Sequence, residues 1–190
     1  MSELEWLAAG LGVINVILVV RRSIWNFPFA LAMVALYFFV FFEAKLYSDS
    51  LLQIFFFVIN GFGWWAWRRA PVVDDGVEVE RMGNAARANW LLGTATASLI
   101  WGWGMANYTD AVAPYLDASV AGMSIAAQIL QSLRRFEAWI LWVAVDILAI
   151  GLYASRGLIV TSGLYSLFLV LAVAGLVAWY RRVTPKVSPA

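Results

Sequence analysis

Hydrophobic residues fall along this chain in seven long runs that are separated by short polar segments. A helix needs about 20 apolar residues to cross the hydrocarbon core of a bilayer, so each run approaches the length of a transmembrane helix. The runs cover Leu4–Val20, Ile24–Phe42, Leu51–Trp67, Trp90–Ala106, Ala118–Leu133, Ala138–Tyr153 and Leu158–Tyr180. The pattern therefore predicts an all-α polytopic membrane protein with seven transmembrane helices.

The composition supports this prediction and excludes several classes of function. Of the 190 residues, 63% are hydrophobic and 13% are charged, against about 45–50% and about 25% in soluble domains. The absence of His and Cys excludes disulfides, thiolate chemistry and imidazole metal sites, and a net charge of +1 shows no nucleic-acid footprint. We expect a protein that is not an enzyme, with no catalytic residues, metal, cofactor or nucleic-acid partner.

Basic residues gather in alternate connections between the spans. Eleven follow spans one, three, five and seven: Arg21, Arg22, Arg68, Arg69, Arg81, Arg87, Arg134, Arg135, Arg181, Arg182 and Lys186. Only Lys45 and Arg156 fall in the other connections. The positive-inside rule therefore predicts an N-terminus outside and a C-terminus in the cytoplasm. The acidic start also lacks the basic region of a secretory signal, which favours a retained first helix.

Aromatic residues near the span ends fit a membrane–water interface. They are Trp6, Trp25, Trp64, Trp65, Trp67, Trp179 and Tyr180. Amphipathic rings are enriched at both surfaces of a bilayer. We therefore expect most of these side chains to form an interfacial belt.

The charge pattern indicates an internal repeat. The pairs Arg21-Arg22 and Arg134-Arg135 are each followed by a second basic pair 47 residues later. A shift of 114 residues aligns Trp25 with Trp139, Gly61 with Gly175 and Trp65 with Trp179, and the basic pairs align at 113. We predict three-helix repeats at residues 1–69 and 117–183, a loop and linker helix at 70–116, and a cytoplasmic tail at 184–190. Parallel repeats of this kind hold a substrate near the midplane, between the halves.

Polar residues within the spans form three stripes. They are Gln53, Asn60 and Trp64 in span three, Ser124, Gln128 and Gln131 in span five, and Trp139, Trp142 and Asp146 in span six. Offsets of three, four or seven place each set on one helical face. Two interpretations remain open, because such residues either bond neighbouring helices or line a substrate cavity.

The chemistry of these side chains describes a possible ligand. Tryptophan faces stack on flat rings and attract cations, and amides bond hydroxyls and carboxamides. Asp146, the only carboxylate deep within a span, favours a positive charge. A small, planar, cationic heteroaromatic with polar groups would suit all three kinds of side chain.

Two segments resemble the PnuC family of nicotinamide riboside transporters. The first runs from Lys45-Leu46-Tyr47-Ser48-Asp49 through Gln53 to Gly61-Phe62-Gly63-Trp64-Trp65-Ala66-Trp67. The second contains Gln128, Arg134-Arg135-Phe136-Glu137-Ala138-Trp139-Ile140-Leu141-Trp142 and Asp146, and the match continues to Trp179. The resemblance covers nearly the whole chain, with Ala138 and Asn60 as departures from the expected family pattern.

The resemblance implies a SWEET-like 3+1+3 facilitator in a bacterial inner membrane. It would carry nicotinamide riboside downhill, and a functionally coupled cytoplasmic kinase would trap the product. The implied substrate region comprises Gln53, Asn60, Trp64, Gln128, Trp139, Trp142 and Asp146, to which the polar stripe of span five adds Ser124. Thiamine, which is also cationic, or another small vitamin is the alternative substrate, and neutral riboflavin suits the charge pattern less well.

Other classes of function fit these residues less well. A membrane enzyme would need a nucleophile–base pair or a metal cluster, which the composition does not offer. A non-transport scaffold or a receptor-like sensor would not need polar stripes in both halves. The partners expected are the lipid bilayer and a small-molecule vitamin, with a possible homo-oligomer.

Overall fold

The computed structural model describes residues 3–43, 47–110, 112–155, 157 and 159–183. Within these ranges lie seven helices, as the hydrophobic pattern predicts. They are α1 (Glu3–Val20), α2 (Asn26–Glu43), α3 (Tyr47–Arg68), α4 (Asn84–Tyr108), α5 (Pro114–Ser132), α6 (Ala138–Ser155) and α7 (Ile159–Tyr180). A short antiparallel hairpin, β1 (Val72–Val73) and β2 (Gly76–Val77), follows α3. Lys45, Arg156, Lys186 and the predicted tail at 184–190 lie outside the described residues.

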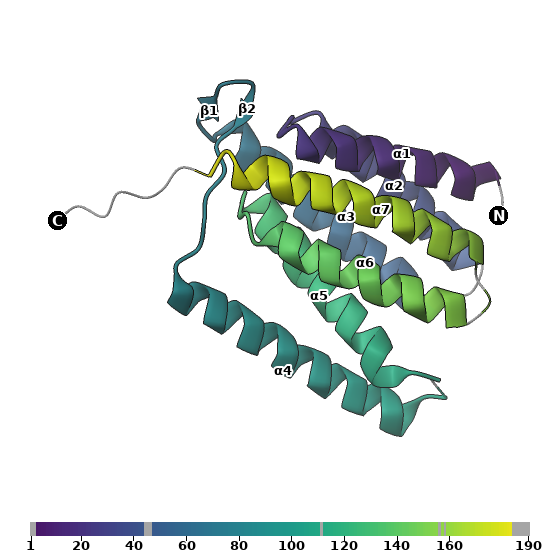
Figure 1. Cartoon of the computed structure of the whole chain (residues 1–190). Coiled ribbons are helices and arrows are strands. Elements are labelled where there is room, and N and C mark those ends of the chain that lie inside the picture. The colour runs from purple at the N-terminus through teal and green to yellow at the C-terminus, as the bar shows by residue number, and fades with distance from the viewer. Residues whose placement is uncertain (1–2, 44–46, 111, 156, 158, 184–190) are drawn as a thin grey trace.

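Six of the helices form a closed ring. The contacts run from α1 to α2, α3, α5, α6 and α7, and α7 returns to α1. The triplets α1–α3 and α5–α7 therefore meet along two lines, α3 against α5 and α1 against α7. Helix α4 lies outside the ring and packs against α5 (Figure 1).

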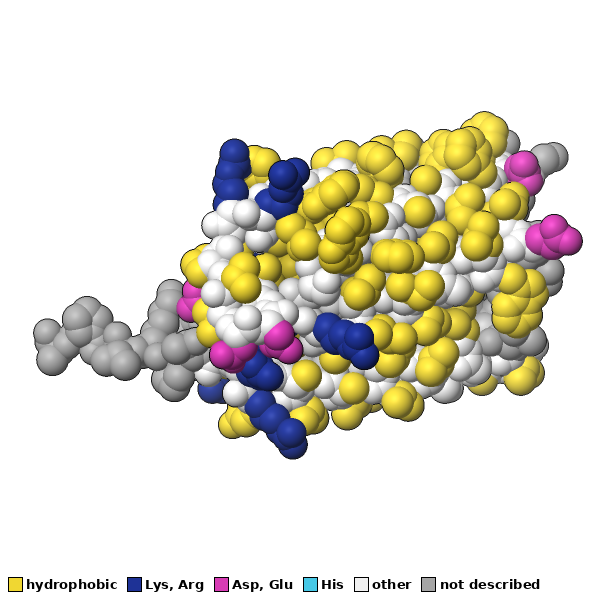
Figure 2. Space-filling view, turned by 90° about the horizontal axis from the view of Figure 1, so that it is seen from above, with side chains coloured by type: hydrophobic (Ala, Val, Ile, Leu, Met, Phe, Trp, Pro, Cys, Tyr) yellow, Lys and Arg dark blue, Asp and Glu magenta, His cyan; other side chains and the backbone are white. Residues whose placement is uncertain are grey.

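The surface of the bundle is largely hydrophobic. Helices α1, α6 and α7 are each long and apolar enough to cross a membrane. Large apolar side chains such as Trp101 and Val170 are more than half exposed. Figure 2 shows hydrophobic side chains along the helices and Lys and Arg side chains toward one end. We call this the arginine-rich end, where α1, α3, α5 and α7 finish.

The ends of α1 and α5 have the same backbone geometry. Each helix closes with a Schellman motif, in which Arg22 and Arg134 take the left-handed position with φ of 56° and 59°. The Arg22 N–H donates to Val19 O at 2.8 Å, and the Arg134 N–H donates to Gln131 O at 2.9 Å. The matched residues are 112 apart, and the turns that start α2 and α6 repeat at the same interval.

The side chains confirm this register and correct the predicted one. Gly175 packs on Trp139, and Gly63 packs on Phe27 in the same way. Trp67 is therefore the counterpart of Trp179, in place of Trp65, and Phe27 is the counterpart of Trp139, in place of Trp25. The alignments at 113 and 114 are wrong by one and two residues, because they follow similar residue types, whereas the packing follows helix faces.

Two of the expected interfacial tryptophans lie in the core instead. Trp67 and Trp179 are 1% and 0% exposed, and Trp64 is partly buried against the same core cluster. Trp6, Trp25, Trp65 and Tyr180 are all more than half exposed, as a belt requires. Position near a helix end does not distinguish these two groups, because the helix face decides burial.

Candidate substrate site

The stripes on α3 and α5 meet between the two halves. The Gln128 amide donates to Asn60 Oδ1 at 3.0 Å, and both side chains are buried. Asn60 in turn donates to Phe56 O at 2.8 Å within its own helix. The two predicted amides therefore face one another across the α3–α5 contact, where each satisfies part of the other's hydrogen-bonding capacity.

Helix α6 presents its aromatic and acidic stripe toward the interior. Asp146 is 4% exposed, and no basic side chain among the described residues pairs with it. The Trp142 indole N–H donates to Gln131 Oε1 at 2.8 Å, which joins α6 to α5. Gln131 is itself buried. The α5 and α6 stripes are therefore in direct contact.

Trp139 is packed in the core, and its indole N–H makes no hydrogen bond with the described residues. Its ring lies edge-on to Trp179, with centroids 5.6 Å apart, and packs against Gly175. Its indole N–H is buried and has no hydrogen-bond partner among the described residues. Phe27 fills the matching position in the first half against Trp67, so the packing itself does not need an N–H. A buried donor of this kind is costly unless a ligand accepts its bond.

Among the described residues, no hydrogen bond joins the remaining predicted site residues to this group. Gln53 lines a groove of about 280 Å³ on the α2–α3 side, together with Phe38 and Phe57. The Ser124 hydroxyl donates to Val120 O, one turn earlier in its own helix. Trp64 packs against the tryptophan core. The structure thus joins Asn60 to Gln128 and Trp142 to Gln131. Gln53 lies two turns before Asn60 in α3, beside the groove against α2.

Sequence reasoning missed three tyrosines and an asparagine. Tyr153 and Tyr165 have ring centroids 5.2 Å apart, and Tyr165 also interacts electrostatically with Asp146 and Tyr37. Asn15 in α1 buries an Oδ1 without a partner among the described residues. Asn15 was detectable as a lone amide within span one. The tyrosines come from three helices, so no spacing along the chain brings them together.

The residues of these stripes and the neighbouring tyrosines together present several kinds of chemical group. It offers amide donors and acceptors, one carboxylate without a basic partner, indole and phenol rings, and an unused indole N–H. No three His, Cys, Asp or Glu side chains in the described residues are placed to hold a metal ion. Such side chains are suited to binding and orienting a ligand, and the described members of the group include no nucleophile–base pair.

Comparison with known proteins supports this interpretation. The family model of the nicotinamide mononucleotide transporter matches residues 2–181. The chain belongs to the nicotinamide mononucleotide transporter family. Its relatives in the family carry the names of transporters, and none of those described below is named as an enzyme.

Three named transporters are similar in sequence to this chain. The nicotinamide riboside transporter PnuC of Neisseria mucosa is 32% identical over 80% of this chain and 60% of its own length. PnuC of Escherichia coli is 25% identical over 93% of this chain and 86% of its own. The riboflavin/roseoflavin transporter RibM of Streptomyces davaonensis is 25% identical over 90% and 82%. The alignment therefore spans less than two thirds of the Neisseria relative and most of the other two.

A solved structure shares the fold of this family member. The crystal structure of the vitamin B3 transporter PnuC superposes with a TM-score of 0.80 and 26% identity, over 95% of this chain and 81% of that one. The helix count of the chain agrees with the fold that the resemblance implies. The departure at Ala138 lies at the first residue of α6, where its side chain is 0% exposed in the core.

Proposed function

We propose that this chain carries nicotinamide riboside across a bacterial inner membrane by facilitated diffusion. The observation that carries the proposal is Asp146, a buried carboxylate in α6 that has no basic partner among the described residues. A buried charge needs a counter-charge or water, and a cationic pyridinium ring supplies one. The transporter relatives named for nicotinamide riboside support the same substrate.

The remaining polar groups fit the rest of such a ligand. The indole faces of Trp139 and Trp142 stack on a planar ring, and the Trp139 N–H is free to donate. Gln128 and Asn60 offer amide groups for ribose hydroxyls or a carboxamide. The substrate-binding residues that we propose are Gln53, Asn60, Trp64, Ser124, Gln128, Trp139, Trp142 and Asp146, and we add Gln131 because it bonds Trp142, and Tyr165.

We also propose how the helices are oriented in the membrane and in which direction net transport runs. All seven helices cross the membrane, as two parallel three-helix repeats joined by α4, with α1 starting outside and the arginine-rich end in the cytoplasm. A cytoplasmic kinase that phosphorylates the product keeps the internal concentration low, so uptake continues downhill. The exposed apolar face of α4 contacts lipid or a second copy of the chain. A reporter fused after α7 that is active only in the cytoplasm tests this orientation.

The deciding experiment measures binding and its dependence on charge. Nicotinamide riboside, thiamine and riboflavin are added separately to the purified protein, and the ligand that raises the apparent Tm is the one that binds, since a bound ligand stabilises by mass action. We expect Asp146→Asn to weaken nicotinamide riboside binding and the exposed Asp110→Asn to leave it unchanged. A shift with riboflavin alone, or equal affinity in Asp146→Asn, would contradict the proposal.

A further inference from the structure

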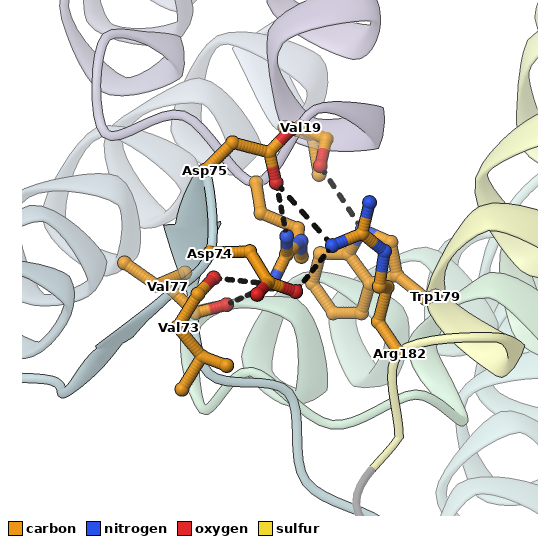
Figure 3. Close-up of polar contacts among 8 residues, drawn as sticks. Val19, Val73, Asp74, Asp75, Val77, Trp179 and Arg182 are labelled. Carbon is orange, nitrogen blue, oxygen red and sulfur yellow. Dashed lines mark hydrogen bonds and ion pairs between the residues drawn. The ribbon is translucent and has the colours of Figure 1, made fainter.

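The loop between α3 and α4 (residues 69–83) contacts both halves of the ring at the arginine-rich end. Its hairpin lies over the ends of α1 and α7, and its following segment reaches the end of α5 (Figure 1). Figure 3 shows the carboxylates of Asp74 and Asp75 beside the guanidinium group of Arg182. A loop that only connected two helices would not need contacts with three others.

The hairpin is firmly attached to α1. Arg22 is 4% exposed, and its guanidinium donates to Val77 O at 3.2 Å, to Val73 O at 3.3 Å and to Asp75 at 2.6 Å. The Val77 N–H returns a bond to Arg22 O at 3.2 Å. Gly76 lies so close that an added Cβ would be 2.6 Å from Arg22 Cβ and 3.1 Å from backbone carbonyl oxygens. Backbone and side-chain bonds therefore hold the hairpin against the end of α1.

The next part of the loop is attached to the second half. Glu80 pairs with Arg134 at 3.1 Å and with Arg135 at 2.7 Å. Its backbone N–H donates to Arg134 O, and its carbonyl accepts from the Phe136 N–H. These bonds involve backbone groups and partly buried side chains, which makes them a fixed attachment.

The contact between Arg182 and the hairpin has a different character. Arg182 follows α7 in the second half, and its guanidinium lies 2.6 Å from Asp74 and 3.6 Å from Asp75. The side chain of Arg182 is 44% exposed, and those of Asp74 and Asp75 are 64% and 77% exposed. Exposed ion pairs are weak and break readily. Beneath them, the Trp179 N–H donates to Val19 O at 3.1 Å across the same α1–α7 contact.

We propose that Asp74, Asp75 and Arg182 form an ionic latch that holds α7 against α1 and keeps the arginine-rich end closed. The inference rests on the proposed transport function. Alternating access requires the two halves to separate at this end before substrate leaves. The latch residues are positioning residues for transport, since they act on the relative placement of the halves and touch no substrate.

The exposure of the Arg182 pairs makes this contact the one that we expect to open. The deeper Arg22 and Glu80 bonds keep each part of the loop on its own half, while the exposed Arg182 pairs join the halves at their surface. Loss of weak, solvent-exposed pairs costs little, so it changes the balance between the closed and open states by a small amount. Neutralising the latch should therefore shift the population toward the open state.

A single buried cysteine can report this population, because the chain has no Cys of its own. Ser132 is 1% exposed at the end of α5, beside Gly63 and under Trp67. Ser132→Cys is nearly isosteric, and neutral N-ethylmaleimide reaches it when the halves separate. With the protein in nanodiscs, we expect Asp74→Asn, which leaves the Arg22–Asp75 bond intact, to raise the labelling rate about two- to five-fold, the range expected for exposed ion pairs.

The controls separate the latch from a general loosening of the protein. Glu78→Gln removes the same charge from the same loop, and the described residues give Glu78 no ion pair, so it should not change the rate. Labelling of Ala85→Cys, which is exposed at the start of α4, should be equal in all variants. Salt at 1 M screens exposed charges, so it should raise wild-type labelling toward the variant rate and leave the neutralised variant unchanged.

A second variant tests the latch without removing charge. Gly76→Ala keeps all three latch residues but forces the hairpin away from Arg22, so it should also raise Ser132→Cys labelling. Equal labelling in wild type, Gly76→Ala and Asp74→Asn would overturn the proposal. Labelling needs no substrate, so a response without nicotinamide riboside uptake would refute only the proposed function, and uptake without a response would refute only the latch.

Discussion

Trp67 and Trp179 contact each other at the arginine-rich end and make reciprocal bonds to the opposite halves. Their ring centroids are 6.1 Å apart. The Trp67 N–H donates to Gln131 O and Ser132 O at the end of α5, and the Trp179 N–H donates to Val19 O at the end of α1. Val19 and Gln131 are themselves 112 residues apart, so the two bonds are related by the internal repeat. Each half therefore caps the first helix of the other.

These two indoles should contribute equally to stability. Trp67→Phe and Trp179→Phe each keep a ring but remove a buried donor, and we expect each to lower stability by about 0.5–1.5 kcal/mol. The apparent Tm in detergent should fall by a similar amount in both. Trp101→Phe is the matched control, since Trp101 is 62% exposed on α4 and should leave the Tm unchanged. A loss in only one of the two core variants would contradict the reciprocal arrangement.

Gly175 should not tolerate a methyl group. An added Cβ would lie 2.5 Å from the Trp139 ring, so Gly175→Ala overpacks the core and should cost about 1–3 kcal/mol. Gly151→Ala is the control within the same half. Nothing lies within 4 Å of its added Cβ, and alanine favours a helix. Comparable melting temperatures for Gly175→Ala and wild type would show that α6 and α7 pack less closely than described.

Trp142 should contribute to ligand binding. If its ring stacks on the substrate, Trp142→Ala should lose on the order of 1–3 kcal/mol of binding free energy, by analogy with base stacking on aromatic side chains. Isothermal titration calorimetry with nicotinamide riboside measures this loss. Trp101→Ala, on the outer surface of α4, is the control and should bind as wild type does. Unchanged affinity in Trp142→Ala would remove this residue from the site.

Uptake should be independent of the proton gradient. The chain has no His, and Asp146 is the only carboxylate deep within a predicted span, so we see no ion-coupling site. Counterflow of nicotinamide riboside in proteoliposomes should continue at the same rate after a protonophore is added. Abolished counterflow would show that transport is coupled to protons.

Asp75 should keep its charge across the physiological pH range. A bond from its own backbone N–H, together with the nearby Arg182 and Arg22, holds the pKa of Asp75 below the ordinary value of 3.8. The stabilisation from a lowered carboxyl pKa is present above the unfolded value and is lost only as the pH falls through the folded value. Ser132→Cys labelling, corrected for the pH dependence of the thiol by Ala85→Cys, should therefore be constant from pH 5 to 8. A rise in the ratio at pH 5 would identify another titrating group.

The helices and the polar stripes on them follow from the amino-acid sequence alone. A run of apolar residues specifies a helix locally, and offsets of three and four define its faces, so seven helices and the buried positions of Asp146, Gln128 and Trp139 were predictable.

Which helix faces meet was set by packing between the helices. The packing set the repeat at 112 residues, took Trp67 and Trp179 from the expected belt into the core, and brought Tyr153 of α6 against Tyr165 of α7. It also placed Asp74 and Asp75 against Arg182. Contacts between helices depend on close packing over distances that spacing along one helix does not encode.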